Sequence, residues 1–91
     1  MTNIISCAQY DFFEIACMNH YDVELTLNDG DVITGKAHNV KVIKDEETRK
    51  EVLELLLENE EILKVELISI HKMRAIKDNP HFKVISLNQK L

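Results

Sequence analysis

The chain has 91 residues and a formal net charge of −5, with 45% hydrophobic and 30% charged residues. A chain of this length forms one small domain, and its two glycines and one proline argue against a disordered or linker-rich protein. No apolar run approaches the ~20 residues that a membrane span needs. The first residues also lack the basic and apolar segments of a secretory signal. We therefore expect a cytoplasmic protein without membrane contact.

Acidic side chains are concentrated at the N-terminal end of the chain. Residues 1–35 contain six acids and no Lys or Arg, whereas residues 36–91 contain ten acids and eleven bases. Such an asymmetry favours attraction to a cationic surface and repulsion from nucleic acid. We expect a basic protein as partner and no direct binding of nucleic acid.

A short helix is predicted from Tyr10 to about Asn19. Ser6 is a candidate N-cap, and Gln9 follows it in the capping-box position. At 100° per residue, the side chains separate into two faces. The predicted buried stripe consists of Tyr10, Phe13, Ala16 and Cys17. The predicted outer face consists of Asp11, Glu14, Ile15 and Met18.

Two strands joined by a tight turn are predicted next. Residues 22–27 alternate between polar and apolar types, which predicts a strand with its apolar side chains facing inward, namely Val23, Leu25 and Leu27. Residues 28–30 read Asn-Asp-Gly, a sequence that tolerates the positive φ of a hairpin turn. A long second strand is expected over 31–43, with a bend or bulge at Gly35.

The second half of the chain allows two interpretations. Residues 45–50 form a charged loop, and residues 51–64 could by propensity form one long helix. We favour a strand, a turn at 58–60 and a bent final strand over 64–76, because β-branched residues alternate there. Asn79-Pro80 breaks the pattern, so we expect one domain over 4–78 and a tail over 79–91 that is loose or a small edge strand. The fold class is mainly β with one N-terminal helix and about five bent antiparallel strands, as in a small barrel.

Two segments resemble a known family. Residues 7–17 follow the pattern C-x-x-Y-D-x-(apolar)-E-x-A-C, which resembles the N-terminal helix of the Rho-binding antiterminators (Rof, also called YaeO). Leu25-x-Leu27-x-Asp29-Gly30, followed by Gly35-x-Ala37, resembles the first hairpin of that family. This hairpin is also similar to the first motif of Sm-like barrels, which the family's fold resembles. The helix pattern is fairly specific, whereas Asp-Gly turns are common.

The resemblance implies a monomeric Sm-like domain that binds the hexameric transcription terminator Rho. In that family the protein occupies the RNA-binding N-terminal region of Rho, excludes the nascent RNA and suppresses termination. Tyr10, Asp11 and Glu14 match the helix motif and become candidate partner-binding residues. Ile15 and Met18 join them as exposed apolar groups on the same helix, because apolar contacts often carry much of an interface's binding energy.

Two other functions are compatible with the sequence. The hairpin motif also fits an Sm-like RNA-binding ring, although His38-Asn39-Val40 lacks the Asp-to-Asn pattern that such rings use for bases, and no Arg-Gly precedes the last strand. The chain could also regulate another basic protein. At residue level, Asp11 and Glu14 could simply form a solvated pair, and Tyr10 and Phe13 are expected in the core.

Catalytic and metal-binding patterns find little support. The sequence has no G-x-S-x-G, no phosphate-binding Gly-rich loop and no H-E-x-x-H. Cys7, Cys17 and His20 match no zinc spacing, and a fourth ligand would have to come from one of the remaining histidines, namely His38, His71 or His81. We expect the cysteines to be reduced core thiols and the protein to have no enzymatic activity, metal or cofactor.

Overall fold

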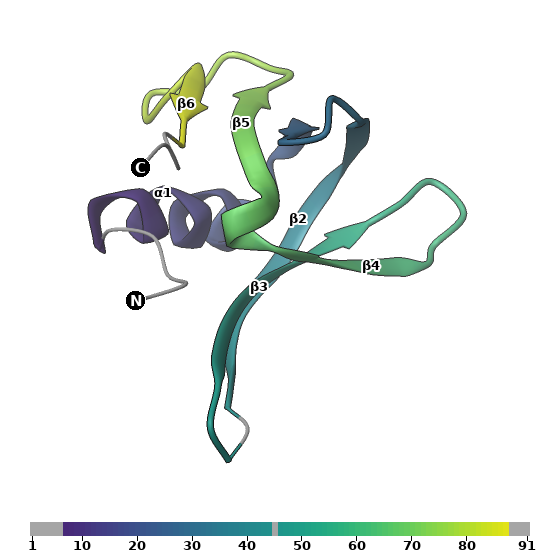
Figure 1. The fold of residues 1–91 in the computed structure, drawn as a ribbon. Coiled ribbons are helices and arrows are strands. Elements are labelled where there is room, and N and C mark those ends of the chain that lie inside the picture. The colour runs from purple at the N-terminus through teal and green to yellow at the C-terminus, as the bar shows by residue number, and fades with distance from the viewer. Residues whose placement is uncertain (1–6, 45, 88–91) are drawn as a thin grey trace.

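The computed structural model describes residues 7–44 and 46–87 as one helix and six strands (Figure 1). In chain order the elements are α1 (Cys7–Met18), β1 (Asp22–Leu27), β2 (Val32–Lys44), β3 (Arg49–Leu56), β4 (Ile62–Glu66), the 3₁₀ turn η1 (Leu67–Ser69), β5 (Ile70–Ala75) and β6 (Val84–Ser86). Within these residues, no helix combines the length and the apolar character that crossing a membrane requires.

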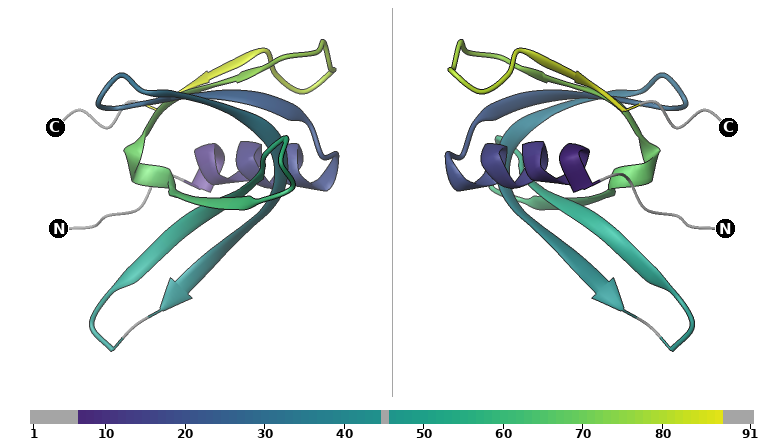
Figure 2. Two further views of the ribbon diagram at one scale, coloured as in Figure 1. Left: turned by 90° about the vertical axis from the view of Figure 1, so that its right-hand side faces the viewer. Right: turned by 90° about the vertical axis from the view of Figure 1, so that its left-hand side faces the viewer.

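All six strands belong to one sheet, in the order β4-β3-β2-β1-β5-β6, with antiparallel neighbours. The sheet is strongly bent, and α1 packs beside its concave side (Figures 1 and 2). β4 and β6 stand at the two ends of the strand order and do not pair with each other. The predicted class, mainly β with one N-terminal helix, is therefore confirmed, and the barrel is open rather than closed.

The first hairpin follows the sequence pattern closely. β1 has the predicted bounds; Val23 and Leu25 are fully buried, and Leu27 is half-buried. In the turn, the Leu27 N–H donates to the Asp31 carbonyl over 2.8 Å and the Gly30 N–H donates to the Leu27 carbonyl over 2.9 Å. Gly30 has a φ of +97°, the conformation for which a glycine is favoured there.

β2 changes its pairing partner part of the way along. It pairs with β1 from Val32 to Lys36 and with β3 from Lys36 to Lys44. A Cβ on Gly35 would lie 2.7 Å from the Leu55 Cγ atom and 2.9 Å from the Leu56 carbonyl oxygen. Gly35 therefore allows β3 to approach β2 where the partner changes. The register irregularity lies between Ala37 and Asn39, so the bulge predicted at Gly35 occurs at His38 instead.

Residues 49–56, 62–66 and 70–75 form strands, and the alternative of a long helix over 51–64 is wrong. β3 begins at Arg49, so the charged connection is shorter than the predicted loop. The predicted turn at 58–60 is closed by the Leu57 N–H, which donates to the Glu61 carbonyl over 2.9 Å. The bent final strand is present as β4, η1 and β5, in which one 3₁₀ turn produces the bend.

The C-terminal tail forms the small edge strand β6, which pairs with β5. Asn79 shapes its approach, because its Oδ1 atom accepts hydrogen bonds from the N–H groups of His81 (2.8 Å) and Phe82 (3.0 Å). The Phe82 ring makes edge contacts with Phe12 and Tyr21, at centroid distances of 5.9 and 6.0 Å. The tail therefore packs against both the helix and the beginning of β1.

The hydrophobic core joins the helix, the sheet and the tail. Its largest fully buried side chains are Phe13, Val23, Leu25, Leu53, Leu55, Leu67, Ile70, Met73 and Leu87. From the predicted helix stripe, Phe13, Ala16 and Cys17 are buried, and Tyr10 is half-buried. The proposed N-cap, Ser6, lies outside the described residues.

Candidate functional site

The helix α1 is held in a fixed position by its buried stripe and by its C-terminal end. The Tyr21 N–H donates to the Ala16 carbonyl over 3.0 Å, and the His20 N–H donates to the Cys17 carbonyl over 3.2 Å. His20 has a φ of +53°, so these two bonds form the Schellman arrangement that ends a helix. The chain then enters β1 directly, which ties the orientation of the helix to the sheet.

The opposite face of α1 is open to solvent. Asp11, Glu14 and Met18 are exposed, with Met18 at 79%, and Ile15 is half-buried. Their spacing of three, four and seven residues places all four on one side of the helix. The structure therefore brings the predicted outer face together as one surface that mixes two carboxylates with two apolar groups. We call these four residues the outer helix face.

Tyr10 lies at the margin of this face. Partial burial raises the pKa of its hydroxyl, Glu14 and Glu51 raise the pKa further, and Arg49 opposes them. The hydroxyl therefore remains protonated at neutral pH and can donate a hydrogen bond. Glu51 and Arg49 belong to β3, so charges at the beginning of β3 act on the helix residue Tyr10.

A second carboxylate from β3 acts on the other end of the helix. Burial raises the pKa of the Cys17 thiol to about 11, and Glu14 and Glu54 contribute to this rise. Glu54 itself forms an ion pair with Lys41, whose Nζ lies 3.0 Å from its Oε2, and this hydrogen bond lowers the pKa of Glu54. Carboxylates from α1 and from β3 thus both act on the Cys17 thiol.

Sequence reasoning missed this contribution of β3. Glu51 is 93% buried and shares the strand face of Leu53 and Leu55, at a spacing of two residues. Counting back by two from those leucines would have placed Glu51 on the helix side of the sheet. The prediction instead treated this stretch as ambiguous between helix and strand.

The residues considered for metal binding do not gather. Among the described residues, no three His, Cys, Asp or Glu side chains form a group that could hold a metal ion. The rings of His20 and His38 have centroids 6.4 Å apart. Cys17 is a buried free thiol.

An open, bent antiparallel sheet with one N-terminal helix places the chain in the class of small, mainly β domains with a single sheet. The family model for modulators of Rho-dependent transcription termination (ROF) matches residues 4–87. The chain belongs to this family.

A solved structure supports the same assignment. The chain is similar to YaeO from Vibrio cholerae O395, in a structure described as bound to magnesium. The two share 32% sequence identity and a TM-score of 0.74, over 87% of this chain and 97% of the other. The resemblance predicted from the helix and hairpin motifs is therefore confirmed. No curated protein sequence gave a significant match.

Proposed function

We propose that this protein inhibits Rho-dependent transcription termination by binding the N-terminal RNA-binding region of Rho through its outer helix face. The observation that carries the proposal is the gathering of Asp11, Glu14, Ile15 and Met18 on one solvent-facing side of α1. Membership of a family that modulates Rho-dependent termination supports Rho as the partner. The protein acts as a monomer on the Rho hexamer and has no enzymatic role.

The chemistry of the outer helix face suits competition with RNA. A site that binds phosphates carries cationic side chains, so Asp11 and Glu14 can occupy it in place of the RNA backbone. Exposed charges mainly increase the association rate and are weakened by salt. Ile15 and Met18 add apolar contact that is insensitive to salt, and the protonated Tyr10 hydroxyl supplies a hydrogen-bond donor at the margin.

Because α1 is anchored to the sheet, its binding to a partner loses little conformational entropy. Phe13 and Ala16 are fully buried, so the helix is already ordered before any partner arrives. Ordering a flexible segment on binding would reduce the affinity. We place the Rho-binding surface within residues 4–78 and give residues 79–87 of the tail a packing role instead.

Magnesium has no part in the proposed mechanism. The related YaeO structure is described as bound to magnesium. The described residues of this chain offer no group of three candidate ligands, and we assign no magnesium ligand among them.

Competition for the RNA site can be measured directly. Purified protein is titrated into Rho that carries a fluorescent oligo(C) RNA, at two salt concentrations. We expect displacement of the RNA, with an apparent affinity that falls as salt rises. Asp11→Lys and Glu14→Lys should each weaken displacement about tenfold, which corresponds to about 1.4 kcal/mol.

The matched control is Asp31→Lys, which makes the same change of charge at an exposed residue after the first hairpin turn. This variant should displace RNA nearly as well as the unmodified protein, and circular dichroism should show all three variants folded. If all three variants lost the same amount of RNA displacement, the net charge of the protein would explain the loss, rather than the outer helix face. Absence of displacement by the folded protein would refute competition at the RNA site, and a pull-down would then seek another basic partner.

An RNA-binding ring has less support from this architecture. The outer edge of β5 is taken by β6, so a ring built by pairing of sheet edges would have to use a strand of three residues. The net charge of −5 also opposes RNA binding. Light scattering distinguishes the two functions, since a ring would give a six- or sevenfold mass.

A further inference from the structure

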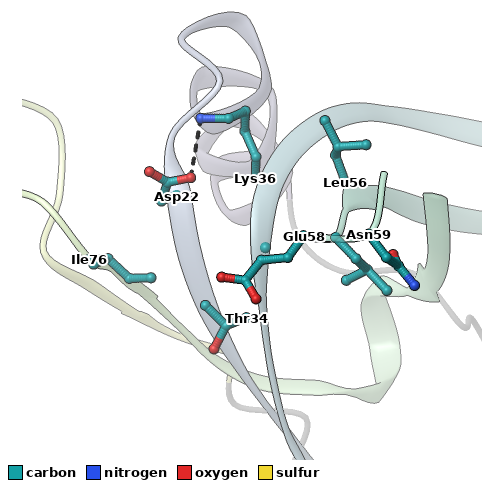
Figure 3. Close-up of a pocket in the computed structure, with 9 residues that line it drawn as sticks. Asp22, Thr34, Lys36, Leu56, Glu58, Asn59 and Ile76 are labelled. Atoms are coloured by element: carbon teal, nitrogen blue, oxygen red, sulfur yellow. Dashed lines mark hydrogen bonds and ion pairs between the residues drawn. The ribbon is translucent and has the colours of Figure 1, made fainter. Parts of the chain in front are cut away.

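A groove opens where β2 changes its partner. Within the described part of the chain, β2 pairs from Val32 to Gly35 with β1 alone, while the chain continues past Leu56, the end of β3, into the turn before β4. The two strands therefore diverge and leave a groove of about 770 Å³ between β2 and that turn. Its lining comes from β1, β2, the end of β3, the β3–β4 turn and Ile76, which follows β5, and includes no described residue of α1 (Figure 3).

The groove combines apolar surface with carboxylates. Leu56, Leu57 and Ile76 supply apolar lining. Asp22 lines the groove and forms an ion pair with Lys36, whose Nζ is 3.2 Å from the Asp22 Oδ1 (Figure 3).

The turn that forms one wall carries negative charge that the groove does not neutralise. In Figure 3 the Glu58 side chain projects from the turn toward the side of the groove where Asp22 lies. Glu58 is exposed and forms no ion pair with the described residues, and Glu60 and Glu61 follow it in the same turn. The unmatched carboxylates favour an occupant with a cationic side chain.

The β2 side of the groove offers an open strand edge. In an antiparallel strand, every second residue directs its N–H and C=O away from a given neighbour. Among the described residues, Val32–Gly35 pair only on the β1 side, and Thr34 lines the groove and directs its N–H and C=O away from β1. An extended peptide can add to such an edge as a further strand, with its side chains entering the adjacent pockets.

We propose that this groove binds an extended segment of a partner protein in which a Lys or Arg stands between apolar side chains. The segment's backbone pairs with the open edge of β2, its cationic side chain contacts Glu58, and its apolar side chains cover Leu56, Leu57 and Ile76. The groove is a second docking surface, separate from the outer helix face, and its existence does not depend on the binding of Rho.

The proposal is tested by nuclear magnetic resonance on the ¹⁵N-labelled full chain. The probe is the peptide acetyl-Gly-Leu-Arg-Leu-Gly-amide, and its charge-reversed counterpart carries Glu in place of Arg. We expect the amide signals of Thr34, Lys36 and Glu58 to shift on addition of the Arg peptide, with a dissociation constant on the order of 1 mM. The Glu peptide should leave these signals unchanged.

Two variations separate the parts of the contact. Glu58→Lys should weaken binding of the Arg peptide about tenfold, whereas Asp11→Lys, on the outer helix face, should leave it unchanged. Methylation of the backbone nitrogen of the peptide's Arg should also weaken binding, because it removes a hydrogen-bond donor from the strand pairing. Neither variation touches the hydrophobic core.

Several results would overturn the proposal. These are an absence of shifts with the Arg peptide, shifts confined to α1, or equal binding of the Glu peptide. Shifts of the groove amides that grow with protein concentration alone would identify a second copy of this chain as the occupant. If the protein failed to bind Rho but its groove amides still shifted with the Arg peptide, the proposed function would be refuted and the groove proposal would stand.

Discussion

At the scale of single residues, the outer helix face depends on partners that lie far away in the sequence. The helix pattern was sufficient to predict that Asp11, Glu14 and Met18 would be exposed and that Phe13 would be buried. It could not predict that carboxylates from β3 would approach Tyr10 and Cys17, since that requires the packing of the sheet on the helix. Their role in binding Rho stays a prediction.

The Cys17 thiol should be unreactive in the folded protein. Burial, together with Glu14 and Glu54, raises its pKa from 9.0 to about 11. In a Cys7→Ser background at pH 8, alkylation by iodoacetamide should be about 100-fold slower in the native protein than in urea, because the thiolate is the reacting form. Equal rates in the two states would show that Cys17 is accessible and unshifted.

The same shift gives a pH dependence of stability. The unfolded chain releases the Cys17 proton near pH 9.0, whereas the folded chain holds it to about 11. The contribution to stability is therefore complete below pH 9.0 and is lost as the pH rises through about 11. Urea unfolding at pH 8 and pH 10.5 measures it, and Cys17→Ala should show a smaller decrease between the two.

Glu54 should stabilise the fold at neutral pH and not in acid. Its hydrogen bond to Lys41 lowers its pKa below the ordinary 4.5, so the contribution is present above that pH and disappears as the pH falls further. Glu54→Gln should lower the free energy of unfolding at pH 7, and the difference from the unmodified protein should shrink at pH 3. A difference that is independent of pH would assign the effect to packing.

At the scale of elements, β2 shows what alternation can and cannot predict. The turn at Gly30 and the extent of β1 follow from local chemistry, so the sequence was sufficient to predict them. The change of partner at Lys36 depends on where β1 and β3 end relative to β2, and no local signal contains that information. The groove follows from this change of partner, which explains why sequence analysis missed it.

Gly35 should be intolerant of even a methyl group. An added Cβ would lie 2.9 Å from the backbone oxygen of Leu56, which cannot move away as a flexible side chain could. Gly35→Ala should therefore lower the free energy of unfolding by about 1–3 kcal/mol, the usual cost of overpacking. The neighbouring exposed Thr34→Ala serves as control in urea unfolding, and equal small effects would contradict the close approach.

At the scale of the whole molecule, the C-terminal tail is part of the hydrophobic core and not an appendage to it. Apolar residues near a chain end carry no local mark of the surface that they will cover, so a loose tail and an edge strand were equally compatible with the sequence. Phe82 and Leu87 are both buried in the core that Phe13 enters from the helix. The tail thereby supports the helix indirectly.

Phe82→Ala should destabilise the whole protein. The substitution removes the ring that contacts Phe12 and Tyr21, and a buried Phe→Ala change costs about 3–5 kcal/mol. Val84→Ala, at a half-exposed position of β6, should cost much less. Thermal unfolding compares the two variants, and similar melting temperatures would show that the tail is not part of the cooperative unit. RNA displacement from Rho, measured below both melting temperatures, should remain intact.

The open sheet also has a consequence for solubility. A closed barrel has no free strand edges, but this sheet ends in β4 and β6, and a free edge is a template for aggregation. β6 has only three residues, and β4 carries the exposed charges of Lys64 and Glu66 along its five. Short length and charge both discourage another chain from adding to these edges. Short edges and exposed charge therefore protect both ends of the open sheet from edge-to-edge pairing between copies of the chain.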